Sequence, residues 1–155
     1  MNWDAVGAIA EALGAAGVIA SLIYLATQIR AQNREARIAA SREVTAAFRE
    51  AVSTMQDEQR ALVVWKAMQD INALEPAEKL QINAIAQQYL RVWEQAHYQH
   101  TEGRLEPESW EAIHNQFTDF MALELFKSVW KIRKNAYRAS FQKYVEALDA
   151  GEYRL

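Results

Sequence analysis

The sequence of 155 residues contains no cysteine, two prolines and five glycines, and each shortage excludes something. Without cysteine the chain has no disulfide, no thiolate metal site and no cysteine nucleophile. With so few helix breakers almost every segment has helical spacing, and we identify no strand pattern. A glycine-rich phosphate loop, a nucleophile elbow and an HExxH motif are also missing. The sequence therefore favours an all-α protein without a familiar catalytic or cofactor motif.

Basic side chains are slightly outnumbered in this chain. There are 17 Lys and Arg against 20 Asp and Glu, which gives a formal net charge of -3. Binding of DNA or RNA requires a surplus of Lys and Arg to pair with phosphates. We therefore expect no nucleic acid among the partners, and we expect no cofactor.

One long uncharged stretch lies near the N-terminus. From Ala12 to Ile29 the sequence is ALGAAGVIASLIYLATQI, eighteen residues without a charged side chain. As a helix it covers roughly 27 Å, close to the roughly 30 Å hydrocarbon layer of a bilayer. We interpret residues 1–30 as a single transmembrane anchor and residues 31–155 as a cytoplasmic helical bundle. The alternative is a buried, alanine-rich core helix of a soluble bundle.

The charges that flank the uncharged stretch predict its orientation. Only the acidic Asp4 and Glu11 precede it, whereas a signal peptide would begin with basic residues. The basic residues follow it, as Arg30, Arg34, Arg37 and Arg42. By the positive-inside rule we expect a bacterial inner-membrane protein with its N-terminus outside and its C-terminal domain in the cytoplasm.

The small and polar residues of the anchor gather on one side of the expected helix. At about 100° per residue this side contains Gly7, Glu11, Gly14, Gly17, Ser21 and Gln28. Small residues let helix backbones approach closely, and polar residues avoid lipid. We predict that this side contacts protein, either in a homo-oligomer or in a larger membrane complex. Chance clustering in an Ala/Gly-rich helix is the alternative.

Beyond the anchor, residues 31–55 are predicted to continue the first helix. They carry an apolar stripe at helical spacing, formed by Val44, Phe48, Val52 and Met55. About five further helices follow. Asp57 is expected to cap the second, while Pro76 and Pro107 are expected to be the first residues of the third and fourth.

The later helices are marked by weaker signals. Gly103 has the position of the residue that follows the third helix. A break is expected at 122–124, before a short fifth helix, and the sixth helix is expected to end at Gly151. His100 falls on the apolar side of the third helix, where we expect a packed core histidine.

A doubled Glu-x-x-His motif is the sharpest hint of chemistry. Glu94 and His97 form the first pair and Glu111 and His114 the second, as in bundles that bind two metal ions. At helical spacing, however, Glu94 points roughly 140° and Glu111 about 120° away from the apolar sides of their helices. Metal ligands of a bundle project inward, so we predict no metal site.

Several residues resemble those of a known group of proteins. They are Trp3, the segment LIYLATQIR from Leu22 to Arg30, Asn33 and Arg37, and later Trp93-Glu94, Tyr98-Gln99, Glu102-Gly103, Trp110, Trp130, Arg133, Tyr137 and Phe141 to Val145. Together they resemble a widespread family of uncharacterised bacterial proteins with one N-terminal transmembrane helix and a small cytoplasmic helical domain. The resemblance covers nearly the whole chain and implies an anchor and an architecture, but no catalytic residue.

The sequence thus predicts a non-enzymatic, membrane-anchored scaffold or assembly subunit. It would associate with itself, or with a larger membrane complex, through the small and polar side of the anchor. Two alternatives stay open. One is a homo-oligomeric pore or channel with Glu11 near its outer mouth, and the weaker one is a metal-binding enzyme of the helical-bundle class.

Overall fold

The computed structural model describes residues 2–148, and all regular elements in this range are helical, which confirms the all-α prediction there. Three of the elements are short 3₁₀ turns, labelled η. In chain order the elements are α1 (Trp3–Ser53), η1 (Thr54–Gln56), α2 (Glu58–Gln69), η2 (Ile71–Ala73), α3 (Pro76–Thr101), α4 (Pro107–Ala122), α5 (Glu124–Arg133), η3 (Lys134–Ala136) and α6 (Ala139–Glu146).

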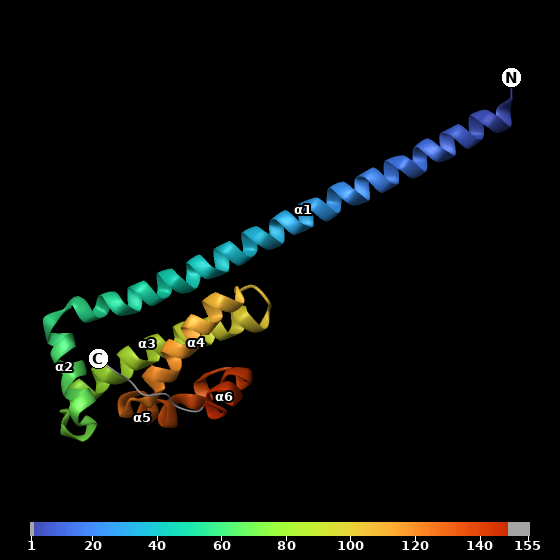
Figure 1. Cartoon of the computed structure of the whole chain (residues 1–155). Helices are drawn as coiled ribbons and strands as arrows, with labels where there is room; N and C mark the ends of the chain where they lie inside the picture. The colour runs from blue at the N-terminus through green and yellow to red at the C-terminus, as the bar shows by residue number, and fades with distance from the viewer. Residues whose placement is uncertain (1, 149–155) are drawn as a thin grey trace. The chain divides into compact units, whose positions relative to one another are not determined.

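The chain divides into two compact units, Met1–Ile38 and Ala39–Leu155. The described part of the first unit consists of the N-terminal portion of α1. The second unit contains the C-terminal portion of α1 and all later elements (Figure 1). A single helix cannot bury its own side chains, so the hydrophobic core belongs to the second unit.

The start of α2 and the start of α3 follow the predicted signals. The Asp57 carboxylate caps α2 by accepting a hydrogen bond of 2.9 Å from the backbone N–H of Arg60. Pro76 is the first residue of α3, and the carboxylate of Glu78 accepts from the backbone N–H of Glu75 at 2.7 Å. Glu78 also pairs with Lys66 of α2 at 2.7 Å, and this hydrogen bond lowers the pKa of Glu78.

The turn between α3 and α4 also confirms the prediction. Gly103 follows α3 with φ of 67°, a left-handed conformation that glycine adopts without steric strain. The backbone N–H of Arg104 then donates to the carbonyl of Gln99 at 2.8 Å and closes the helix end. Pro107 opens α4 as expected.

Two further boundaries were predicted in the last third of the chain. The break at 122–124 is confirmed, since α4 ends at Ala122 and α5 begins at Glu124, with Leu123 extended between them. The sixth helix, α6, ends at Glu146. Its predicted end, Gly151, lies outside the described residues.

Aromatic rings form the centre of the second unit. Trp93 of α3 and Phe117 of α4 have ring centroids 4.5 Å apart, and Phe117 also stacks on Phe141 of α6 at 5.8 Å. All three side chains are almost completely buried. Figure 1 shows α3 and α4 alongside each other, with α5 and α6 packed against them. The core of the second unit is therefore largely aromatic, and α3 is its central helix.

Candidate functional site

All six predicted anchor-interface residues lie on the exposed N-terminal part of α1, namely Gly7, Glu11, Gly14, Gly17, Ser21 and Gln28. A Cβ atom added at any of the three glycines would meet no atom within 4 Å. The Ser21 hydroxyl donates to the carbonyl of Gly17 at 2.8 Å, so it is satisfied within the helix. The glycines are therefore not required by packing within this unit, and they leave three positions of its small and polar side without a side chain.

Large apolar side chains cover the rest of the same segment. Leu13 is 69% exposed, Leu22 59% and Ile23 62%. Among the described residues, α1 is the one helix that is long and apolar enough to cross a membrane, a judgement based on length and composition. None of its most apolar window is buried. The four arginines expected to set the topology, Arg30, Arg34, Arg37 and Arg42, follow on α1 and are all exposed.

The predicted outward orientation of Glu94 is wrong. This residue is only 7% exposed. Its carboxylate accepts a hydrogen bond of 2.7 Å from the backbone N–H of Arg138 and pairs with Arg91 at 2.7 Å. The helical-wheel argument failed because it assumed one buried side, whereas α3 is buried on several sides. Val92, Trp93 and Glu94 are consecutive and all buried.

Glu94 is the centre of a set of contacts that we call the Glu94 clasp, formed by Glu94, Arg91 and Arg138. Arg91 also donates to the carbonyl of Ala136 at 3.0 Å, and its guanidinium lies 4.3 Å from the centre of the Tyr137 ring. Arg138 lies 4.3 Å from the ring centre of Tyr98. The clasp joins α3 to η3 and to the N-cap of α6, so this carboxylate has a structural task.

All three histidines of the chain gather around Trp110 of α4. The ring of His100 stacks on that of Trp110, with centroids 4.4 Å apart and planes at 8°. The rings of His97 and His114 lie 5.9 and 6.1 Å from it. His100 packs against Trp110 as expected, but it is only half-buried, so the prediction of a core histidine holds only in part; the buried histidine is His97. We call these three residues and Trp110 the histidine cluster.

The histidine cluster does not recruit the carboxylates of the doubled motif. Glu111 is exposed, and Glu94 is engaged in the clasp. Nδ1 of His114 instead shares a hydrogen bond of 2.6 Å with the hydroxyl of Tyr144. Within the described range, no group of three His, Asp or Glu side chains is arranged to hold a metal ion. The two motifs therefore come together through their histidines alone.

Burial shifts two pKa values within this region. The pKa of His97 is lowered from 6.5 because burial penalises the charged imidazolium, and repulsion from His100 adds to this effect. Attraction to Glu94 opposes it. Burial also raises the pKa of the Tyr144 hydroxyl above its ordinary value. The cluster is thus an aromatic environment that favours a neutral His97.

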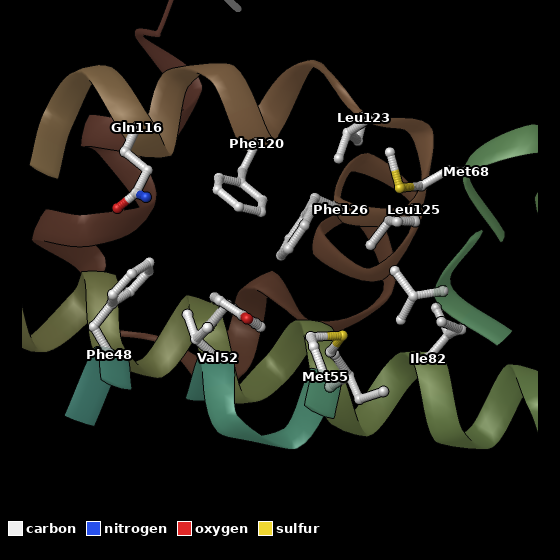
Figure 2. Close-up of a pocket in the computed structure, with 13 residues that line it drawn as sticks. Phe48, Val52, Met55, Met68, Ile82, Gln116, Phe120, Leu123, Leu125 and Phe126 are labelled. Atoms are coloured by element: carbon white, nitrogen blue, oxygen red, sulfur yellow. The ribbon is translucent and has the colours of Figure 1, made fainter. Parts of the chain in front are cut away.

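Sequence reasoning missed a cavity of about 290 Å³ within the second unit, which we call the apolar cavity. Its lining comes from α1, η1, α2, α3, α4 and α5 (Figure 2). Among residues 2–148 no Lys, Arg, Asp, Glu or His lines it, and the polar side-chain atoms belong to Gln116 and Tyr89. The lining residues include Phe48, Val52, Met55, Met68, Phe120 and Phe126.

The apolar cavity has a partial signal in the sequence. Phe48, Val52 and Met55 belong to the stripe that was predicted for residues 31–55, but Val52 keeps 40% of its surface exposed. A second cavity of about 110 Å³ shares Phe48 and Gln116 with the first and is lined also by Val44 and Thr45. This side of α1 therefore borders open space between Val44 and Val52.

Comparison with known proteins adds no relative to these observations. The chain matches no protein-family model, no curated protein and no solved structure.

Proposed function

We propose that this chain is a single-pass membrane protein whose N-terminal helix anchors a helical domain and assembles with other transmembrane helices. The observation that carries the proposal is the exposure of large apolar side chains on all sides of one long helix. A helix that is apolar all round belongs either in a protein core or in a membrane.

Covering from one side would leave much of this surface in water. Leu13 and Leu22 are nine residues apart and so lie about 180° apart around the helix, yet both are more than half exposed. A single partner helix in a coiled coil covers one seam only. At about 25 cal/mol per Å², placing the nine Val, Leu and Ile side chains of Val6–Ile29 in hydrocarbon stabilises the protein by on the order of 10 kcal/mol. A bilayer supplies this cover in all directions.

The orientation follows from the arginines after the apolar segment. Arg30, Arg34 and Arg37 are exposed and close to its end, so they favour the cytoplasmic side. The N-terminus is then outside and the helical domain inside. A reporter enzyme that is active only outside the cytoplasm, fused after Leu155, is expected to be inactive. An active fusion would show that the proposed orientation is wrong.

The partner in the membrane is another helix that approaches the small and polar side of the anchor. Without a Cβ atom, Gly7, Gly14 and Gly17 allow close contact between backbones, which is a recurring way for transmembrane helices to associate. A second copy of the same chain has the same small and polar side. The protein is therefore a non-enzymatic scaffold or assembly subunit that forms homo-oligomers or joins a membrane complex.

Replacement of Gly14 by Ile tests the assembly. The new side chain blocks close approach without making the segment less apolar, so self-association in mild detergent is expected to weaken about tenfold, the effect of losing roughly 1.4 kcal/mol. Ala16→Ile is the matched control, because it adds a similar bulk about 160° away around the same helix. Analytical ultracentrifugation across detergent concentrations measures both variants.

Two results would contradict the assembly. One is a wild-type protein that is monomeric in detergent and in bilayers, and the other is an equal effect of Gly14→Ile and Ala16→Ile. The pore alternative is favoured by one observation, namely that Glu11 is an exposed carboxylate on the same side as Ser21 and Gln28. If the protein conducts ions across liposome membranes and Glu11→Gln abolishes this flux, the pore is favoured over the scaffold.

A further inference from the structure

The walls of the apolar cavity exclude most classes of small ligand. They are formed by Phe, Val, Leu, Ile and Met side chains, with one amide from Gln116 and one hydroxyl from Tyr89. Since the described part of the chain places no charged group in this lining, it offers nothing there to hold a phosphate, a carboxylate-rich metabolite or a metal ion. An occupant must therefore be hydrocarbon along most of its length.

The size and shape of the cavity fit a chain rather than a single ring. A cavity of about 150 Å³ is enough to hold benzene, and this one has about 290 Å³. Figure 2 shows Gln116 and Phe48 at one end of the lining and Met68 at the other. Met55 and Met68 have flexible, polarisable side chains, which adapt to an occupant of irregular outline.

One end of the cavity is polar. Gln116 is exposed and lines both this cavity and the smaller one of about 110 Å³, which also carries the Thr45 side chain. An amide side chain both donates and accepts hydrogen bonds, so it suits a carboxyl or ester group. We propose that the apolar cavity binds one alkyl chain of a fatty acid or a phospholipid, with the carboxyl or ester group beside Gln116.

The proposed anchoring provides a supply of such chains. Phe48 follows Ile29, the last residue of the apolar segment, by nineteen residues, so the covalent link keeps the domain close to any membrane that holds the segment. This supply rests on the proposed function, whereas the chemistry of the cavity does not. The two claims are therefore separable by experiment.

Photolabelling of the full chain in lipid nanodiscs tests both claims in one measurement. The probes are hexadecanoic acid that carries a diazirine on its chain and, in a parallel arm, a phosphatidylcholine with the same chain. After illumination, mass spectrometry locates the adducts on peptides. Adducts on residues 3–29 report the anchor, and adducts on residues 64–68 and 120–126 report the cavity. Labelling in only the free-acid arm or only the phospholipid arm identifies the source of the chain.

Variants that fill the cavity provide the decisive comparison. Leu125 is 3% exposed and lines the cavity, so Leu125→Trp is expected to lower cavity adducts at least about tenfold while leaving anchor adducts unchanged. Leu80→Trp is the control, because Leu80 is 73% exposed and lies outside the cavity lining. Val64→Phe serves as the filling variant if Leu125→Trp does not fold. The proposal is overturned if neither probe labels 64–68 or 120–126, or if the folded filling variant is labelled like wild type.

Discussion

The two units of the chain use the same apolar residue types in opposite ways. Leu22 and Ile23 in the first unit are 59% and 62% exposed, whereas Leu90 and Ile82 in the second are 0% and 2% exposed. The second unit covers most of its apolar residues with its own helices, although a few such as Leu62 and Leu80 stay exposed, while the described part of the first unit consists of one helix without that cover. The comparison shows that the type of a side chain does not by itself decide whether it is buried. The exposed apolar surface of the first unit indicates that something outside the chain covers it.

The largest effect on this comparison is expected from Phe117→Ala. The Phe117 side chain is 1% exposed and packs between Trp93 and Phe141, so its loss leaves a cavity in the core. We expect the second unit to lose about 3–5 kcal/mol of unfolding free energy. Urea unfolding followed by tryptophan fluorescence measures the loss. Leu22→Ala is the control and should leave the unfolding free energy of the second unit nearly unchanged. A similar loss from both variants would show that the two units unfold together.

A charge in the first unit tests the opposite side of the comparison. We expect Val18→Arg to disfavour membrane insertion by about 2.5–3.5 kcal/mol, because the side chain lies near the middle of the apolar segment. Membrane fractionation and alkaline extraction compare this variant with wild type. Leu62→Arg on α2 is the matched control, since Leu62 is 60% exposed and outside the segment. If alkaline extraction releases both variants from the membrane fraction equally, residues 1–30 are not a membrane anchor.

The Glu94 clasp is expected to make a smaller contribution within the second unit. Glu94→Gln keeps the size of the side chain but removes the charge that pairs with Arg91 and strengthens the hydrogen bond from Arg138. We expect a loss of about 1–2 kcal/mol in unfolding free energy, measured by urea unfolding. Glu111→Gln, an exposed carboxylate on α4, should change stability by less than about 0.5 kcal/mol. No difference between these two variants would contradict the structural role of the clasp.

The smallest expected effect is a pH dependence from the histidine cluster. His97 has a lowered pKa in the folded state, so the unfolded chain binds its proton first as the pH falls. The stability that comes from a neutral His97 is complete above pH 6.5 and decreases below that value until the folded pKa is reached. Unfolding free energies measured from pH 7.5 to 5 should show this decline, at a rate of at most about 1.4 kcal/mol per pH unit.

His97→Phe is the variant that isolates this dependence. Phenylalanine retains an aromatic ring among Trp110, Phe141 and Tyr144 but does not titrate. The decline below pH 6.5 should become shallower, because the variant has no imidazole at position 97. An unchanged profile would show that His97 does not cause the pH dependence.

The helix boundaries were predictable because their signals are local. Asp57 caps a helix through its own carboxylate, Pro76 and Pro107 fit only a first turn, and Gly103 adopts a positive φ. These properties are set by residues close in the sequence and depend little on how the helices pack. The membrane location, the orientation, the assembly and the family resemblance are not tested by these boundaries and stay predictions.

The burial of Glu94 and the apolar cavity were not predictable from local patterns. A helical wheel for α3 gives one apolar side, but η3 and the start of α6 cover a second side, where Glu94 meets Arg138. The cavity is a volume left between six elements, and no short stretch of sequence encodes it. The stripe from Phe48 to Met55 marked only one of its walls.

The Glu94 clasp also has a consequence for the order of folding. It joins positions 44 residues apart, whereas the capping and turn contacts of α2, α3 and α4 join residues at most a few positions apart. Contacts that close long loops cost more chain entropy, so they tend to form after local ones. During synthesis on the ribosome, α3 emerges well before Arg138. Until Arg138 has been added, the Glu94 carboxylate lacks this partner and stays hydrated. We therefore expect docking of α6 to be a late event in the folding of the domain.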